Sequence, residues 1–123
     1  DSIKLLKRVI LYNKTRNKGG FMGKNRAIKI LGNIIGNLVI HKILIKYTNK
    51  PESIHHLKSE IEAYRDNSLG IASEHNWNEK DKLEIKSASL KKFTSDMANF
   101  YKDVKFPAEE VPKLIEETIN EIL

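Results

Sequence analysis

The chain has no cysteine among its 123 residues, which excludes disulfide bonds and thiolate chemistry. No signal peptide is predicted either, because charges at Lys4, Lys7 and Arg8 interrupt the apolar residues near the start. Both absences are compatible with a reducing cytosol, and we expect a cytoplasmic protein. By length, residues 1–123 are expected to form a single domain, and the start at Asp1 without a Met leaves a fragment of a longer chain as the alternative.

The sequence also lacks an uncharged apolar run long enough to span a membrane. Its most apolar stretch, 27–47, contains 13 Ala, Val, Ile, Leu or Tyr among 21 residues. The uncharged part from Ile30 to Ile40 is only 11 residues long, and Lys29 and Lys42 lie outside its two ends. A span needs about 20 apolar residues, and a central Lys costs on the order of 3 kcal/mol. We therefore predict a buried core element and no membrane anchor.

Residues 27–47 are predicted to form one helix at the centre of the fold. At 100° per residue the first apolar residues share one side, and from Val39 onward the apolar residues move to the other side. A central helix that is covered by different partners at its two ends explains this rotation. Two alternatives stay open: a break near Gly36, and a strand over 38–48, which is rich in β-branched residues.

Gly32 and Gly36 have the four-residue spacing of the close-packing motif of membrane helices. That meaning requires an apolar segment of about 20 residues, which the chain does not have. We expect instead that these small residues mark the place where another backbone comes close.

The remaining sequence favours an all-α, single-domain bundle of four or five helices. Residues 2–18 are amphipathic, and the alternative α+β fold would pair a short strand at 8–12 with 38–48. A capping-box-like arrangement, Asn49, Pro51 and Glu52, precedes a helix that should reach at least residue 67. A helix from Asn78 to about residue 103 and a last helix opened by Pro112 complete the prediction.

Three apolar stripes identify the predicted core of these helices. The first is Ile54, Leu57, Ile61, Tyr64, Ser68, Ile71 and His75. The second is Leu83, Leu90, Met97 and Val104, one heptad apart, joined by Phe93, Phe100 and Tyr101. The third is Val111, Leu114, Ile115, Thr118, Ile119 and Ile122.

Acidic residues are nearly missing from the first half of the chain. Residues 1–50 hold 12 Lys or Arg against Asp1 alone, whereas residues 51–123 hold ten against 15 acids. This asymmetry predicts a polyanion partner for the first half, or pairing between the halves. Lys and Arg neutralise phosphates, glycines let backbone amides approach, and an aromatic ring can stack on a base. The predicted nucleic-acid-binding residues are Lys14, Arg16, Lys18, Phe21, Lys24, Arg26 and Lys29.

The function favoured by this pattern is non-catalytic binding of DNA or RNA through the phosphate backbone. The alternative is a structural or protein-interaction module, a homodimer in which the basic half meets an acidic surface. A solvated cationic face with no partner is the simplest interpretation of the same charges. The glycine-rich segment 19–24 is not a P-loop, because three residues separate its glycines where four are needed, and Asn25 replaces the hydroxyl that holds magnesium.

A cluster of potential metal ligands follows Pro51. Glu52 and His55 have the spacing of half of a di-iron motif, but no second copy exists. On a helical wheel we place Glu52, His56 and Glu60 opposite the apolar stripe, which predicts a solvated face and no metal or cofactor. His41 and His75 are expected to be hydrogen-bonded core or boundary residues. No catalytic arrangement of side chains can be identified, so a non-enzyme is favoured.

Overall fold

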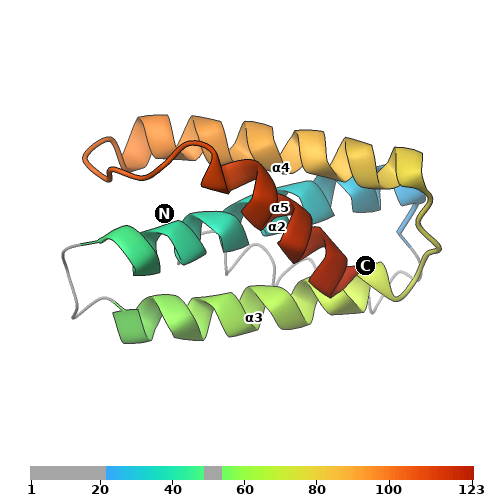
Figure 1. Cartoon of the computed structure of the whole chain (residues 1–123). Coiled ribbons are helices and arrows are strands. Elements are labelled where there is room, and N and C mark those ends of the chain that lie inside the picture. The colour runs from blue at the N-terminus through green and yellow to red at the C-terminus, as the bar shows by residue number, and fades with distance from the viewer. Residues whose placement is uncertain (1–21, 49–53) are drawn as a thin grey trace.

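The computed structural model describes residues 22–48 and 54–123. These residues form four helices and no strand, namely α2 (Lys24–Tyr47), α3 (Ile54–Ala72), α4 (Glu79–Phe100) and α5 (Glu110–Ile122) (Figure 1). The predicted all-α bundle is confirmed. The strand alternative for 38–48 is wrong, because α2 continues without a break to its last residue. The predicted helix at 2–18 and the alternative strand at 8–12 lie outside the described residues.

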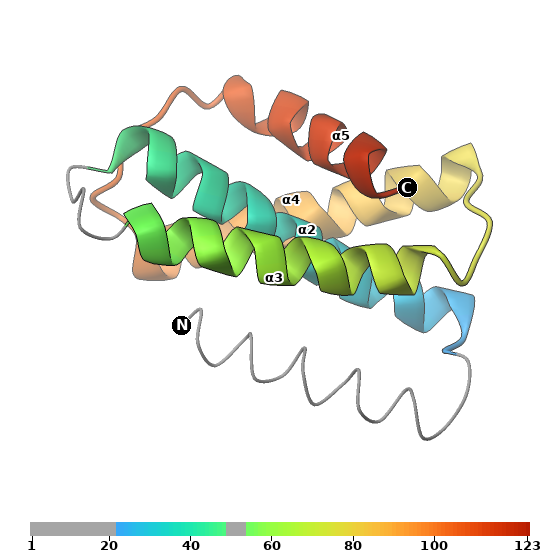
Figure 2. The same cartoon turned by 90° about the horizontal axis from the view of Figure 1, so that it is seen from below.

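Helix α2 is the centre of the bundle, as predicted. It runs between α4 on one side and α3 on the other, and α5 crosses over it (Figures 1 and 2). Residues 34–41 are buried without interruption, so this part of the helix has no solvent-exposed face. Burial by several neighbouring helices explains why the apolar residues of α2 do not keep to one side.

Helix α2 resembles a membrane-spanning helix in its length and its apolar composition. Among the described residues it is the one helix that is long and apolar enough to cross a membrane. Of its most apolar window, 72% is buried inside the bundle, which is what a core helix requires.

The contact between α2 and α4 is made through small residues. A Cβ atom added to Gly36 would lie 2.8 Å from Lys92 Cβ and 2.9 Å from the carbonyl oxygen of Ser89. A Cβ atom on Gly32 would overlap the Cβ atom of Ala88. The two glycines therefore let the backbone of α4 approach α2 closely, as their spacing predicts.

This close contact corrects the predicted apolar stripe of α4. Leu83 and Leu90 are 66% and 42% exposed, and Phe100 is also exposed. The residues that α4 buries are four positions apart along one face, namely Asp81, Ile85, Ser89, Phe93 and Met97. Only a small side chain such as that of Ser89 fits where the two backbones meet, so the face with larger leucines is turned outward.

The starts of α4 and α5 lie close to their local signals. Asn78 and Asp81 form a capping box at the start of α4: the Asp81 amide donates to Asn78 Oδ1 at 2.8 Å, and the Asn78 amide donates to Asp81 Oδ2 at 3.1 Å. Helix α5 begins at Glu110, two residues before Pro112. Proline is tolerated there because amides of the first turn have no intrahelical partner. The predicted stripe of α5 is confirmed, with Leu114 only half-buried.

Candidate functional site

The predicted nucleic-acid-binding residues are only partly within the described chain. Lys14, Arg16, Lys18 and Phe21 lie outside the described residues, whereas Lys24, Arg26 and Lys29 belong to the first turns of α2.

Lys24 is engaged by acidic and aromatic neighbours from the second half of the chain. Its Nζ atom lies 2.5 Å from Asp81 Oδ2 and 5.7 Å from the centroid of the Trp77 ring. The hydrogen bond from Lys24, together with the backbone amide of Asn78, lowers the pKa of the Asp81 carboxyl. Arg26 and Lys29 are exposed. Of the described candidates, these two present the more accessible charges.

The basic residues near the end of α2 pair with acids of α5. Lys42 Nζ donates to Thr118 Oγ1 at 2.9 Å and lies 3.6 Å from Glu121 Oε1. Lys46 Nζ lies 3.2 Å from both carboxylate oxygens of Glu110. Some bases of the first half are thus paired with acids of the second half, which is one of the two outcomes that the charge asymmetry predicts.

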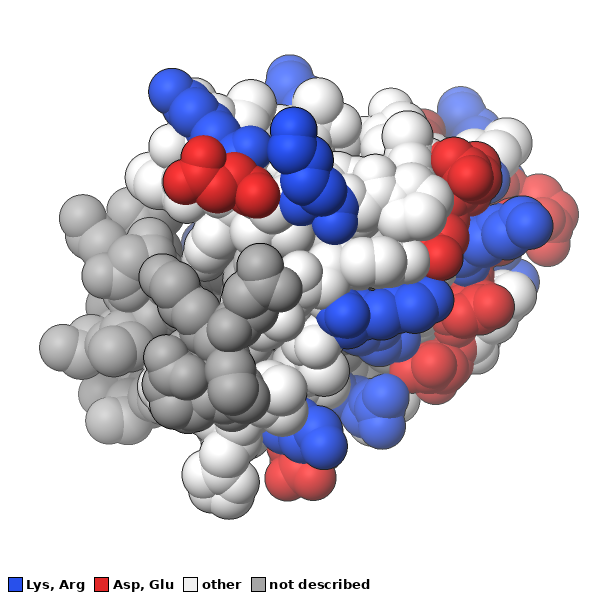
Figure 3. All heavy atoms as spheres, turned by 60° about the vertical axis from the view of Figure 1, so that its left-hand side comes forward, with Lys and Arg blue, Asp and Glu red and all other residues white. Residues whose placement is uncertain are grey.

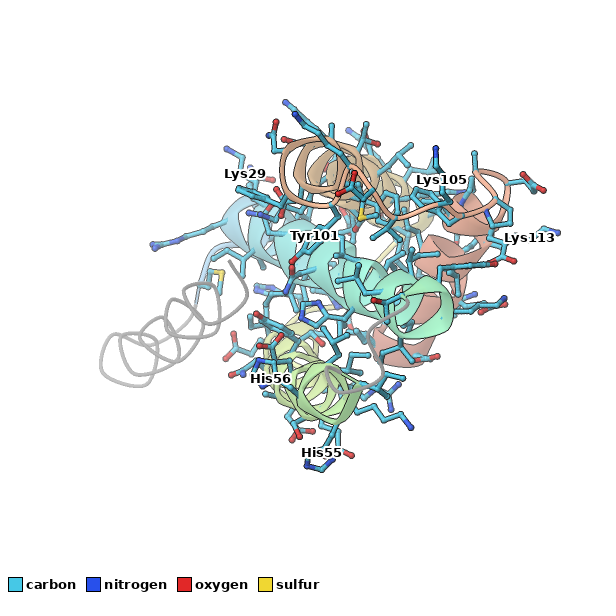
Figure 4. All side chains as sticks on the ribbon, turned by 90° about the vertical axis from the view of Figure 1, so that its left-hand side faces the viewer. Lys29, His55, His56, Tyr101, Lys105 and Lys113 are labelled. Atoms are coloured by element: carbon cyan, nitrogen blue, oxygen red, sulfur yellow. The ribbon has the colours of Figure 1, made fainter. Side chains whose placement is uncertain are left out.

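The space-filling view shows how charge is distributed over one face of the molecule. On this face Lys and Arg side chains alternate with Asp and Glu, and uncharged residues separate them (Figure 3). Seen along the bundle, Lys29 lies on the opposite side from Lys113 (Figure 4). The described Lys and Arg residues therefore do not form one broad basic patch on this face. Any basic surface that includes Lys29 lies on the side of the bundle opposite to Lys113.

A buried polar pair joins α2 to α3. The side chains of His41 and Glu60 are 1% and 3% exposed, and His41 Nε2 is hydrogen-bonded to Glu60 Oε2. The other ring nitrogen, Nδ1, donates to the carbonyl oxygen of Asn37 at 2.8 Å. Because a carbonyl only accepts, Nδ1 carries a proton, and a second proton must lie between Nε2 and the carboxylate. The pair is therefore either imidazolium with carboxylate or imidazole with carboxylic acid.

The burial of Glu60 corrects the predicted solvated face. Glu60 lies about 60° from Leu57 around the helix, so it borders the buried stripe and is not opposite it. His56 is 60% exposed, as predicted, and its Nε2 atom lies 2.8 Å from Glu60 Oε1. Glu52 lies outside the described residues, and His55 points away from the bundle (Figure 4).

The buried carboxyl group of Glu60 contributes to raised pKa values of two tyrosines. The Tyr64 ring meets the His41 ring edge to face, with centroids 5.5 Å apart. Burial raises the pKa of Tyr64 above its usual range, and the negative charge of Glu60 raises it further. The pKa of Tyr101 is raised by the same two causes, with a contribution from Asp96. The cluster therefore keeps both phenols protonated.

This cluster is not arranged as a metal centre. Each carboxylate oxygen of Glu60 is occupied by a different imidazole, so the two Nε2 atoms approach the carboxyl group separately. Within the described ranges no three His, Asp or Glu side chains are placed to hold one metal ion. The arrangement can neutralise a buried charge between α2 and α3.

The surface of the bundle is hollowed at two places that the described residues line. A cavity of about 450 Å³ opens where the ends of α2, α3 and α4 meet, and its lining includes Leu44, Leu57, His56 and Tyr101. A groove of about 330 Å³ lies between α4 and the start of α5 and is lined mainly by apolar side chains. Neither hollow can be predicted from the sequence, because each is formed by residues from different helices.

The pairing of His41 with Glu60 was also not predicted from the sequence. His41 was expected in the core, but its partner lies 19 residues away on another helix. The available signal was the position of Glu60 beside the apolar stripe of α3.

Comparison of the chain with protein-family models, with curated proteins and with solved structures finds no match.

Proposed function

We propose that the protein binds the phosphate backbone of a nucleic acid, without catalysis, through its basic N-terminal half. The observation that supports this proposal is the charge of residues 1–50, which hold 12 Lys or Arg and one acid. Such a local excess of positive charge attracts polyanions and gives affinity that does not depend on base sequence.

The described contacts narrow the set of phosphate-binding residues. Lys24 is removed from it, because Asp81 and Trp77 hold its side chain. Arg26 and Lys29 remain, since both are exposed on the first turns of α2. They follow Arg16 and Lys18 closely in the chain, so these four residues form the set to be tested.

A binding role without catalysis is supported by the burial of the polar cluster. His41 and Glu60 have almost no solvent-accessible surface, so a substrate cannot reach them. Tyr64 is fully buried, and the pKa shifts of both tyrosines disfavour their nucleophilic phenolate forms. The cluster is better explained as a structural connection between α2 and α3.

The test is the salt dependence of binding to single- and double-stranded DNA and RNA of mixed sequence. Each phosphate neutralised on a duplex contributes about −0.9 to the slope of log affinity against log salt. Replacing Arg16, Lys18, Arg26 and Lys29 together with Gln is expected to flatten the slope by about three to four units. The change should be similar for different base sequences.

A matched control removes the same charge elsewhere. Lys58, Lys102, Lys105 and Lys113 are exposed, and replacing them together with Gln is expected to leave the slope nearly unchanged. Equal losses from both sets would mean diffuse attraction by a chain of net charge +6 and would contradict the proposed surface. If the parent protein shows no binding at about 100 mM salt, the protein-interaction module replaces this proposal.

A further inference from the structure

The outer face of α4 carries an apolar and charged pattern that no described helix covers. Helix α4 lies at the edge of the bundle, with α2 on its inner side (Figure 1). Leu83 and Leu90 are exposed and one heptad apart, so they share a side of this outer face. Glu84 and Lys91 are also one heptad apart and flank them, and neither forms an ion pair within the described residues.

We propose that this face pairs with the same face of a second copy of the chain. If the two α4 helices lie antiparallel about a two-fold axis near Ser87, Leu83 lies beside Leu90 of the partner subunit. The same register places Glu84 opposite the partner subunit's Lys91. Both contacts occur twice, because a two-fold axis repeats every contact.

The arrangement of the face supports this register. The two leucines lie on one side of Ser87 around the helix and the two charged residues lie on the other side. A two-fold axis perpendicular to an antiparallel helix pair brings like flanks together, so leucines meet leucines and charges meet opposite charges. Ser87 is small and exposed at the centre, which allows the two helices to approach.

The apolar groove beside α4 extends the contact. It begins at Leu90 and Thr94 and continues over Phe93 and Met97 toward α5. Leu83 of the partner subunit reaches the rim of this groove, where it removes further apolar surface from water. A single pair of helices is a small interface, so the dimer dissociates on dilution. This pairing uses none of the bases proposed to bind nucleic acid and stands independently of that function.

Sedimentation equilibrium of the full chain from about 10 µM to about 1 mM tests the pairing, since this range covers weak dissociation constants. The parent protein is expected to form dimers as its concentration rises. E84K or K91E alone places like charges opposite each other at both contacts and should weaken the dimer about tenfold or more. An equimolar mixture of E84K and K91E chains restores opposite charges and should restore association, as should the double variant.

The control variants make the same charge changes at Glu117 and Lys102, which are exposed and away from the outer face of α4. They should leave the dissociation constant unchanged. The substitutions are at exposed positions, and circular dichroism checks that each variant keeps its helices. A parent protein that stays monomeric to about 1 mM would overturn the proposal. A dimer that is insensitive to E84K and K91E would also overturn it, because another surface would then form the contact.

Discussion

At the scale of single residues, the main feature is a carboxyl group placed where a core side chain would be expected. Glu60 is accommodated because α2 presents His41 to one of its oxygens and α3 presents His56 to the other. Burying a charge is costly unless a partner compensates it, so each member of the inner pair depends on the other. The pair gives α2 and α3 a specific polar connection within an otherwise apolar contact.

This dependence predicts a strongly non-additive pair of substitutions. Glu60→Leu leaves His41 buried without its partner and should lower the free energy of unfolding by about 3–5 kcal/mol. His41→Leu should cost a similar amount, since it leaves the carboxyl group unpaired. The double variant should cost clearly less than the sum, which urea denaturation of all four proteins measures.

His56→Ala provides the comparison, because this imidazole is mostly exposed and should contribute no more than about 1 kcal/mol. Additive effects of Glu60→Leu and His41→Leu would contradict the interpretation that the two side chains stabilise each other.

At the scale of helices, the contact between α2 and α4 determines which face of α4 is buried. Gly32 and Gly36 give α2 a surface without side chains, and α4 meets it with Ala88 and Ser89. The large apolar side chains of α4 lie on either side of this contact or face outward.

Gly36→Ala tests the contact. The new methyl group would lie within 3 Å of Lys92 and of the Ser89 carbonyl oxygen, so the two helices would have to separate. Overpacking of this kind should lower the free energy of unfolding by about 1–3 kcal/mol, although alanine favours the helix itself. Thermal or urea denaturation measures the change.

Gly23→Ala is the matched control, because no atom lies within 4 Å of the added Cβ and its backbone angles suit an ordinary residue. Because Gly23 is the N-cap of α2, where alanine is less favourable than glycine, the change should cost no more than about 1 kcal/mol. A Gly36→Ala protein as stable as the parent would show that α4 shifts without cost.

The contact between α2 and α4 illustrates which features of the fold can be predicted from the sequence and which cannot. The central helix, the start of a helix at Asn78 and the apolar face of α5 follow from local patterns, and the structure confirms them. The outward leucines of α4 and the buried Glu60 depend on which helix packs against which face. Periodicity reports that a face exists, but the partner of that face is determined by tertiary packing. Of the candidate phosphate contacts, Lys24 could not be excluded in advance because Asp81 is 57 residues away.

At the scale of the whole molecule, opposite charges of the two halves meet where α5 crosses α2. Lys42 and Lys46 of α2 approach Glu121 and Glu110 of α5. Tyr47 strengthens this contact, since its hydroxyl donates to Glu110 Oε1 at 2.6 Å. Arg65 of α3 also pairs with Glu121, at 3.0 Å. The last helix is thus connected to the bundle through charge as well as through its apolar face.

The Glu110 contact predicts a dependence of stability on pH. The hydrogen bond from Tyr47, followed by that from Lys46, lowers the pKa of the Glu110 carboxyl in the folded protein. The unfolded chain therefore binds the proton first as pH falls. The stabilisation is complete above the ordinary Glu pKa of about 4.3 and is lost as pH falls through the lower folded value. Glu110→Gln should reduce the loss of stability over this range, measured by urea denaturation at a series of pH values.

Glu117→Gln is the control for that series, because Glu117 is exposed and should leave the pH profile unchanged. An unchanged profile for Glu110→Gln as well would mean that solvent screens the contact and that the apolar face alone holds α5.

The position of α2 has a consequence for how the molecule comes apart. Since α2 touches each of the other three described helices, none of them can detach without uncovering part of it. Its central amides should therefore exchange with deuterium only through near-global opening, while the amides at the outer ends of α3 and α5 exchange through local fraying. Among α2, α3, α4 and α5 no pair of helices forms a separate unit around its own core, so these described helices are expected to be lost together in one cooperative transition.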